Sequence, residues 1–219
     1  MSHDRPISHE RLRQIEASVC QALARAGLPL PICQAPGGPV PLTMLLEVLG
    51  IEVIQVPDLT RRRAREILGP LIPEESSTRE EESLGGLMAA GGGITRVLVR
   101  ANDILTRRRF TLAHELGHHL LHKPARPEGI LRFDLLAGEG GDMTPEGMRL
   151  IEAEAHAFAA ELLMPAQAVR AWHACPGTCQ LSHGLAASRL ASLLLVSLQA
   201  ASRRLHDLEL AAHQPGEVT

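Results

Sequence analysis

Residues 110–122 read FTLAHELGHHLLH, and within this stretch His114, Glu115 and His118 form a His-Glu-x-x-His pattern. Residues four apart on a helix share a face, so the two imidazoles converge on one point, which suits a tetrahedral zinc ion. Glu115 directly follows the first histidine, where its carboxylate can reach a metal-bound water without becoming a ligand. The pattern therefore predicts a zinc hydrolase site; ordinary, partly buried helix histidines are the alternative.

The residues around this pattern favour the metal site. Every residue of 110–121 other than Glu115 and the histidines is uncharged, and four leucines recur at helical spacing. Such a helix can be buried with only its metal-facing groups polar. Thr106 is the expected N-cap. The three arginines 107–109 would then fill the first turn, which the helix dipole disfavours unless they pair with acids elsewhere.

A catalytic zinc keeps three protein ligands and an open position for water, so a third ligand must come from elsewhere in the chain. The best donor is IEAEAHAFAAELLMP at residues 151–165. Glu152 and His156 lie one turn apart there and project from nearly the same face. Glu152 is the expected ligand, while His156 can orient a ligand from behind.

Strong helix signals bound this second segment. Thr144 precedes Pro145, and because Thr can cap a helix and Pro is tolerated at its first position, a helix is predicted to start there. Pro165 is predicted to end it. Two further glutamates on this helix, Glu154 and Glu161, are expected to be solvated charges, the usual state of glutamate.

Together these segments resemble the ImmA/IrrE family of bacterial zinc metallopeptidases. RRRFTLAHELGHHLLH at 107–122 is followed about thirty residues later by E-x-E-A-x-x-F-A-A-E-L-L-M-P, and the resemblance extends upstream to PLTMLLEVLGIEVIQVPDL at 41–59. It implies that Glu152 is the third zinc ligand. Such proteins usually carry Asn or Asp four residues after that ligand, where this chain has His156. This departure leaves open whether His156 orients a ligand or competes as one.

The remaining patterns predict an α+β fold. A hairpin is expected around the glycines 91–93, and an antiparallel edge strand beside the zinc helix can hold an extended peptide by strand addition. Residues 1–172 are predicted to form a zincin-like (gluzincin) metallopeptidase domain with a small sheet. Residues 173–219 are predicted to be a linker and a helix-turn-helix-like module. Other helices are expected at 8–26, 42–49 and 60–68, a strand at 51–56, and a charged, solvated loop at 70–83.

The C-terminal module has two predicted helices, 185–193 and 198–208, which resemble the helix-turn-helix-like tail of the family. Its arginines, Arg189, Arg203 and Arg204, are nearly balanced by Asp207 and Glu209. Phosphate binding draws its affinity from several Lys or Arg contacts, so packing or partner docking is favoured over direct DNA readout.

A second cluster of potential ligands precedes this module. His173, Cys175, Cys179 and His183 have the residue types of a zinc site, but their spacing fits no common zinc finger. A loop with incidental thiols is the favoured interpretation, and a second metal site the alternative.

Composition narrows the class of protein. The net charge is -3 and Lys123 is the single lysine, so neither a nucleic-acid coat nor an acidic-membrane binder is indicated. No apolar run approaches the about 20 residues of a membrane span, and no signal-peptide pattern is present, so a cytoplasmic protein is expected. The chain has no tyrosine, which excludes that residue as an oxyanion donor.

These observations predict a zinc endopeptidase with one Zn2+ per chain, held by His114, His118 and Glu152, with Glu115 as the proton-transferring base. The resemblance implies the substrate, a helix-turn-helix (XRE-type) transcriptional repressor whose cleavage releases a stress-response or mobile-element regulon. One alternative is a metal-bound regulator that sequesters a repressor without cutting it. Another is a DNA-binding regulator that uses its C-terminal helices. The intact Glu115 argues against the first, and the small positive charge argues against the second.

Overall fold

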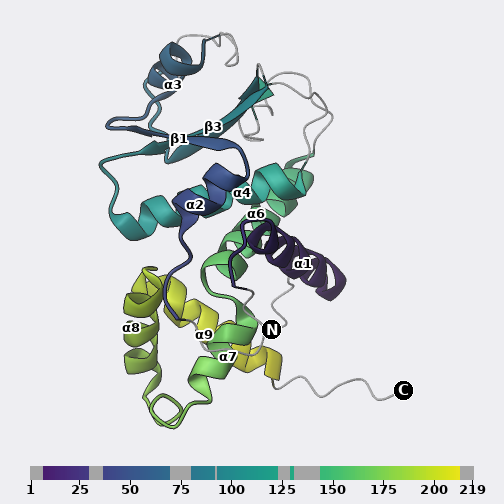
Figure 1. The fold of residues 1–219 in the computed structure, drawn as a ribbon, viewed down its shortest axis with the longest axis vertical. Coiled ribbons are helices and arrows are strands. Elements are labelled where there is room, and N and C mark those ends of the chain that lie inside the picture. The colour runs from purple at the N-terminus through teal and green to yellow at the C-terminus, as the bar shows by residue number, and fades with distance from the viewer. Residues whose placement is uncertain are drawn as a thin grey trace.

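The computed structural model describes residues 7–29, 37–69, 80–91, 93–122, 129–130 and 144–212. A four-stranded sheet lies between helix α3 (Arg61–Leu68) on one face and helices α2 (Leu42–Val48) and α4 (Leu105–Leu121) on the other, and α6 (Pro145–Leu163) packs against α4 (Figure 1). Helices α7, α8 and α9 lie on the far side of α6 from the sheet (Figure 1). The prediction of a mixed α+β fold is confirmed.

The sheet has the order β1-β3-β2-β4, with β1 parallel to β3 and the other pairs antiparallel. Alternate residues face opposite sides, as the two-residue period of a strand requires. Met88 and Val97 join the core above α4, while Leu87 and Leu98 join the cluster under α3. The strands are β1 Ile51–Val56, β2 Gly86–Gly91, β3 Ile94–Arg100 and β4 Gly129–Ile130.

The hairpin of β2 and β3 is confirmed, and an edge strand beside the zinc helix stays a prediction, because β4 pairs with only two residues of β2, away from its start beside α4. Strand β2 lies between β3 and β4, because the two residues of β4 pair with Ala89 and Ala90. A strand of two residues leaves no alternating pattern in a sequence, which is why it could not be predicted.

Three helices begin where their capping residues predict. The side-chain oxygens of Ser8, Thr60 and Thr144 each accept a hydrogen bond from a backbone N–H in the first turn. The helices are α1 His9–Arg25, α2 Leu42–Val48, α3 Arg61–Leu68, α4 Leu105–Leu121, α6 Pro145–Leu163, α7 Ala166–His173, α8 His183–Leu194 and α9 Leu198–Ala212.

Helix α4 begins earlier than predicted, so the assignment of Thr106 as its N-cap was wrong. Ile104 is the N-cap, and its carbonyl accepts the N–H groups of Arg107 and Arg108 at 3.0 Å. Among the described residues, one arginine of this triplet pairs with an acid. The Nε atom of Arg107 lies 3.4 Å from Oδ2 of Asp103. Arg108 and Arg109 instead donate to the Gln55 side chain and the Val40 carbonyl.

Charge pairs join α3 to the segment that follows it. Arg61 and Arg65 pair with Glu82 and Glu80, so this end of the predicted loop contacts α3 and is not simply solvated. Its remaining residues, 70–79, lie outside the described part of the chain.

The C-terminal helices share the main core. Leu190 of α8 and Leu205 of α9 are buried in the same cluster as the helices around the candidate site. Arg204 donates to the Met164 carbonyl at 2.9 Å and forms an ion pair with Glu161. Glu161 was expected to be solvated; its side chain is instead 12% exposed, because α9 covers it.

Within the described ranges, no single helix is long and apolar enough to cross a membrane. Helices α8 and α9 reach that length and composition only when taken together, and the chain bends by 117° between them.

Candidate metal centre

The site is built where α4 and α6 cross. Gly117 of α4 lies against α6, and a Cβ on it would come within 3.1 Å of the Phe158 Cβ and 3.2 Å of the Ala155 backbone. Contacts below about 3.4 Å are tighter than packed carbon atoms allow. The glycine therefore lets the helix of the two histidines approach the helix of Glu152.

Three side chains converge at this crossing. His114 Nε2 lies 3.3 Å from one carboxylate oxygen of Glu152, and His118 Nε2 lies 3.2 Å from the other. The two Nε2 atoms are 3.1 Å apart. Zinc–ligand bonds of about 2.0–2.1 Å place the ligand atoms of a tetrahedral ion about 3.3–3.4 Å from one another. The three side chains therefore fit three corners of a zinc tetrahedron.

Burial differs among these groups. His118 is 1% exposed, whereas the side chain of Glu152 is 39% exposed. Hydrogen bonds from His114 and then His118 hold the pKa of Glu152 well below its usual range, although partial burial opposes this. Glu152 is therefore a carboxylate at neutral pH, the form that can bind a cation.

Glu115 is buried beside this set, with 4% of its surface exposed. Strand β2 begins against it, because a Cβ on Gly86 would lie 3.1 Å from Glu115 Oε1 and would clash with the methyl group of Thr111. Glycine at this position lets the sheet approach the helix and confines the Glu115 carboxylate.

These groups line one cavity of about 180 Å³ that is open to solvent. Its walls come from the start of β2, from α4 and from α6. The lining residues are Gly85, Gly86, Phe110, Thr111, His114, Glu115, His118, Glu152 and His156.

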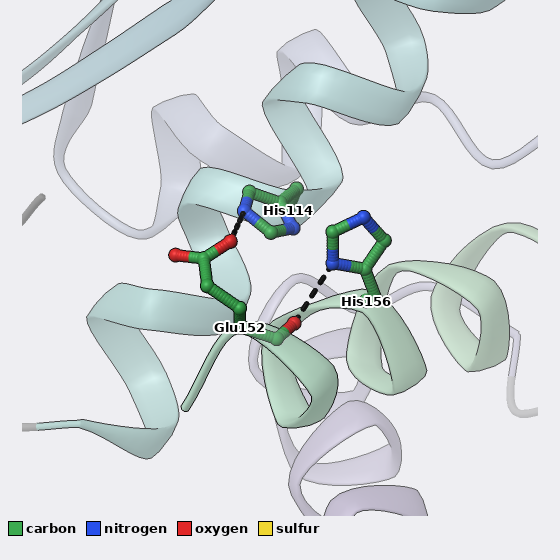
Figure 2. Close-up of side chains that lie close together, drawn as sticks. All are labelled: His114, Glu152 and His156. Carbon is green, nitrogen blue, oxygen red and sulfur yellow. Dashed lines mark hydrogen bonds and ion pairs between the residues drawn. The ribbon is translucent and has the colours of Figure 1, made fainter. Parts of the chain in front are cut away.

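His156 lies at the exposed rim of this cavity. Its Nδ1 is 2.8 Å from the backbone oxygen of Glu152, and its ring centroid lies 4.6 Å from that of His114 (Figure 2). The Phe110 ring is also near, with its centroid 5.4 Å away. Partial burial lowers the pKa of His156, and the hydrogen bond to the Glu152 carbonyl opposes this shift. The side chain therefore lies beside the His114 ring and is held by the backbone of α6.

Glu154 was expected to be solvated, and this was wrong: it is 6% exposed. It accepts hydrogen bonds from Arg11 Nε and Nη2 at 2.9 and 2.6 Å. His122 Nε2 lies 2.9 Å from the same carboxylate. A buried glutamate needs such partners, and here α1 supplies the cation.

The second predicted cluster is not assembled. Cys175 donates to the Ala171 carbonyl, Cys179 to that of Pro176, and His183 Nε2 lies 3.0 Å from Ser202 Oγ. Over the described ranges, a group of ligand atoms within 4.8 Å of one another is found at His114, Glu152 and His156, and it includes none of the four residues of this second cluster.

Sequence reasoning missed three residues that support the site: Arg11, Gly86 and His122. His122 follows His118 by four residues, so its place on the same helix face was readable from the sequence. Arg11 is 143 residues from its partner Glu154 and carries no local signal.

The family model described as the IrrE N-terminal-like domain, Peptidase M78, matches residues 72–206. The chain belongs to this ImmA/IrrE peptidase family. The match covers α4, α6, α7, α8 and the first part of α9, so it includes every residue of the candidate centre. No curated protein matches the chain. The resemblance at residues 41–59 lies outside the matched range and stays a prediction. As an ImmA/IrrE peptidase with a His/Glu cluster suited to a metal, the chain is assigned a metallopeptidase-type function.

Proposed function

We propose that the chain is a zinc-dependent endopeptidase with a zincin-like catalytic domain, and that His114, His118 and Glu152 hold one zinc ion. The observation that carries this proposal is the spacing of 3.1–3.3 Å among their ligand atoms, which fits a tetrahedral ion. Membership of a peptidase family supports the reaction class.

A zinc ion held by His114, His118 and Glu152 would supply Lewis acidity for the hydrolysis of a peptide bond. Glu115 lines the same cavity as the three ligands. Its carboxylate accepts the proton of the attacking water and passes it to the departing amine. The Glu115 side chain lies against Gly86, where a Cβ would come within 3.1 Å of its Oε1, so the close approach of β2 places this base at the cavity wall.

The proposed substrate is a helix-turn-helix (XRE-type) transcriptional repressor, cleaved so that a stress-response or mobile-element regulon is released. The family resemblance supports this choice. Helices α8 and α9 have helix-turn-helix-like geometry, with three residues between them and a 117° bend. Arg204 is engaged by Glu161, which leaves the module few free cations for phosphates. We therefore propose that the module packs on the core or docks a protein, and that the enzyme acts in the cytoplasm.

The test compares the wild type with Glu115→Gln. The amide keeps the size of the carboxylate but cannot accept the proton of water, so the variant should keep its zinc and fold while losing cleavage by several orders of magnitude. Each protein is incubated with purified short helix-turn-helix proteins encoded beside it, and the products are examined on gels and by mass spectrometry. If both proteins inactivate the repressor equally and leave it intact, the chain is a sequestering regulator and not a protease.

A further inference from the structure

The wall of the cavity contains one large apolar side chain among the described residues, that of Phe110. The other lining residues are three histidines, two glutamates, two glycines and Thr111. Phe110 is partly buried and lines the open cavity, so part of its surface is in contact with solvent. Covering such a surface with an apolar group releases water and favours binding. Phe110 therefore offers the substrate a contact that the metal centre and the base do not provide.

The ring of His156 extends this apolar wall. The ring centroids of Phe110 and His156 are 5.4 Å apart and their planes are tilted by 51°, a spacing at which aromatic rings attract each other. His156 Nδ1 lies 2.8 Å from the Glu152 backbone oxygen, and because a carbonyl can only accept, Nδ1 is the donor. One ring is thus held by α4 and the other by the backbone of α6.

This wall and the base lie on opposite flanks of the candidate centre. Successive residues of a helix are about 100° apart, so Phe110 and Glu115 point about 140° apart on α4, with the two ligand histidines between them. The contacts agree, because Glu115 lies against Gly86 of β2 whereas the ring of Phe110 lies near His156 of α6. A base that passes its proton to the departing amine has that amine on its own flank. The residue whose carbonyl is attacked then lies on the flank of Phe110.

We propose that Phe110, supported by His156, selects the substrate residue on the amino-terminal side of the cleaved bond and favours a large apolar side chain there. This inference rests on the proposed function, because it requires that the protein cleaves its substrate. An alanine at that position covers less of the ring and gains less from burial. An aspartate would have to give up its water against an apolar surface, which is costly.

The test uses the repressor with its cleavage site mapped by mass spectrometry, in its natural form and with the residue before the cut replaced by alanine or aspartate. The enzymes are the full chain as wild type, Phe110→Ala, Phe110→Leu and Leu105→Ala. Leu105 is a half-exposed apolar residue at the start of α4, so its variant controls for the loss of a large side chain from this helix.

We expect the mapped site to have a large apolar residue before the cut. Replacing that residue by alanine should lower kcat/KM at least about tenfold for the wild type and for Leu105→Ala, and aspartate should lower it further. Phe110→Ala should show less than about a twofold loss on the alanine substrate, because the wall that senses this side chain has been removed. Phe110→Leu keeps an apolar wall and should keep most of the discrimination.

Two measurements that need no cleavage separate substrate selection from support of the ligand His114, whose ring centroid lies 6.2 Å from that of Phe110. Zinc affinity, measured by competition with a chelating dye, should be the same in the wild type and Phe110→Ala. Repressor binding in calorimetry, with Glu115→Gln present to prevent cleavage, should weaken at least about fivefold when Phe110→Ala is added. Lower zinc affinity with unchanged repressor binding would show that Phe110 serves His114 and would overturn the inference.

The cleavage data can overturn it in other ways. If Phe110→Ala lowers kcat/KM equally for all three substrates, or if the dependence on Phe110 appears at the residue after the cut, the inference is wrong and the proposed function stands. A wild-type protein that cleaves no repressor would overturn both proposals.

Discussion

His122 Nε2 lies 2.9 Å from Glu154 Oε2, a contact that joins the end of α4 to the middle of α6 one turn beyond the candidate ligands. Arg11 of α1 binds the same carboxylate through two nitrogens, so three helices meet at one buried charge. The candidate centre requires α4 and α6 to keep a fixed separation. This network ties the two helices together at a second point, in addition to the close packing at Gly117.

Removing the cation of this network should destabilise the protein. Arg11→Met leaves the Glu154 carboxylate buried with one partner fewer, and hydrogen bonds to charged groups contribute about 1.5–3 kcal/mol. We expect a loss of that size in the free energy of unfolding, measured with urea. Arg13→Met, an exposed arginine of the same helix, is the control and should change stability by less than about 0.5 kcal/mol. Equal losses in both variants would contradict a specific role for Arg11.

The same carboxyl should make stability depend on pH. Burial raises the pKa of Glu154, but the hydrogen bonds from Arg11 and His122 outweigh it, so the pKa is lowered on folding. Such a group stabilises the fold above its unfolded pKa of about 4.3, and this contribution is lost as the pH falls through the folded value. Glu154→Gln should therefore lose less stability than the wild type as the pH is lowered from about 5. Parallel curves in urea titrations at each pH would refute the assignment.

The features that could be predicted from the sequence are those that depend on neighbouring residues. The capping residues Ser8, Thr60 and Thr144 and the His-Glu-x-x-His spacing each act within a few residues, so they could be read directly. Glu154 and Glu161 were misjudged because their burial depends on α1 and α9, which are remote in the chain. The N-cap of α4 was misplaced because the turn after β3 starts the helix at a residue with no capping side chain. Long-range contacts, not local propensity, decided these points.

The zinc content of the protein should fall when a proposed ligand is replaced. The wild type is expected to hold about one zinc per chain, and His118→Ala should lose most of it, because two remaining ligands bind zinc weakly. Glu152→Ala should lose it similarly, as measured by elemental analysis after dialysis. His173→Ala serves as a control and should keep its metal, because His173 is not part of the described ligand group. Full metal in Glu152→Ala would transfer the third-ligand role, with His156 as the first candidate.

Gly86 should be needed to position Glu115. In Gly86→Ala the new methyl group meets both the Thr111 methyl group and Glu115 Oε1, so we expect a lower melting temperature and weaker cleavage of the identified repressor. Thr111→Ser removes the first of these contacts. The double variant should therefore recover stability while its cleavage rate stays low, because the contact at 3.1 Å from Glu115 remains. Recovery of both properties would show that Gly86 serves packing and does not position Glu115.

Variants of the two arginines of α9 should show whether the C-terminal module only packs on the core or also docks a protein. Arg204 bonds to the Met164 carbonyl and pairs with Glu161, and both side chains of that pair are less than 15% exposed. Arg204→Met leaves Glu161 buried without its cation, so it should cost about 3 kcal/mol of stability. Arg203 is exposed and next to Arg204, so Arg203→Met should leave stability unchanged.

The same variant tests docking. If the module docks the repressor, Arg203→Met should weaken repressor binding in calorimetry whereas Arg204→Met should not, and DNA affinity should be negligible in both the wild type and Arg203→Met. A salt-sensitive, sequence-selective shift of duplex DNA that is lost in Arg203→Met would instead identify α9 as a DNA-reading helix, since base readout is normally backed by cationic contacts to phosphates.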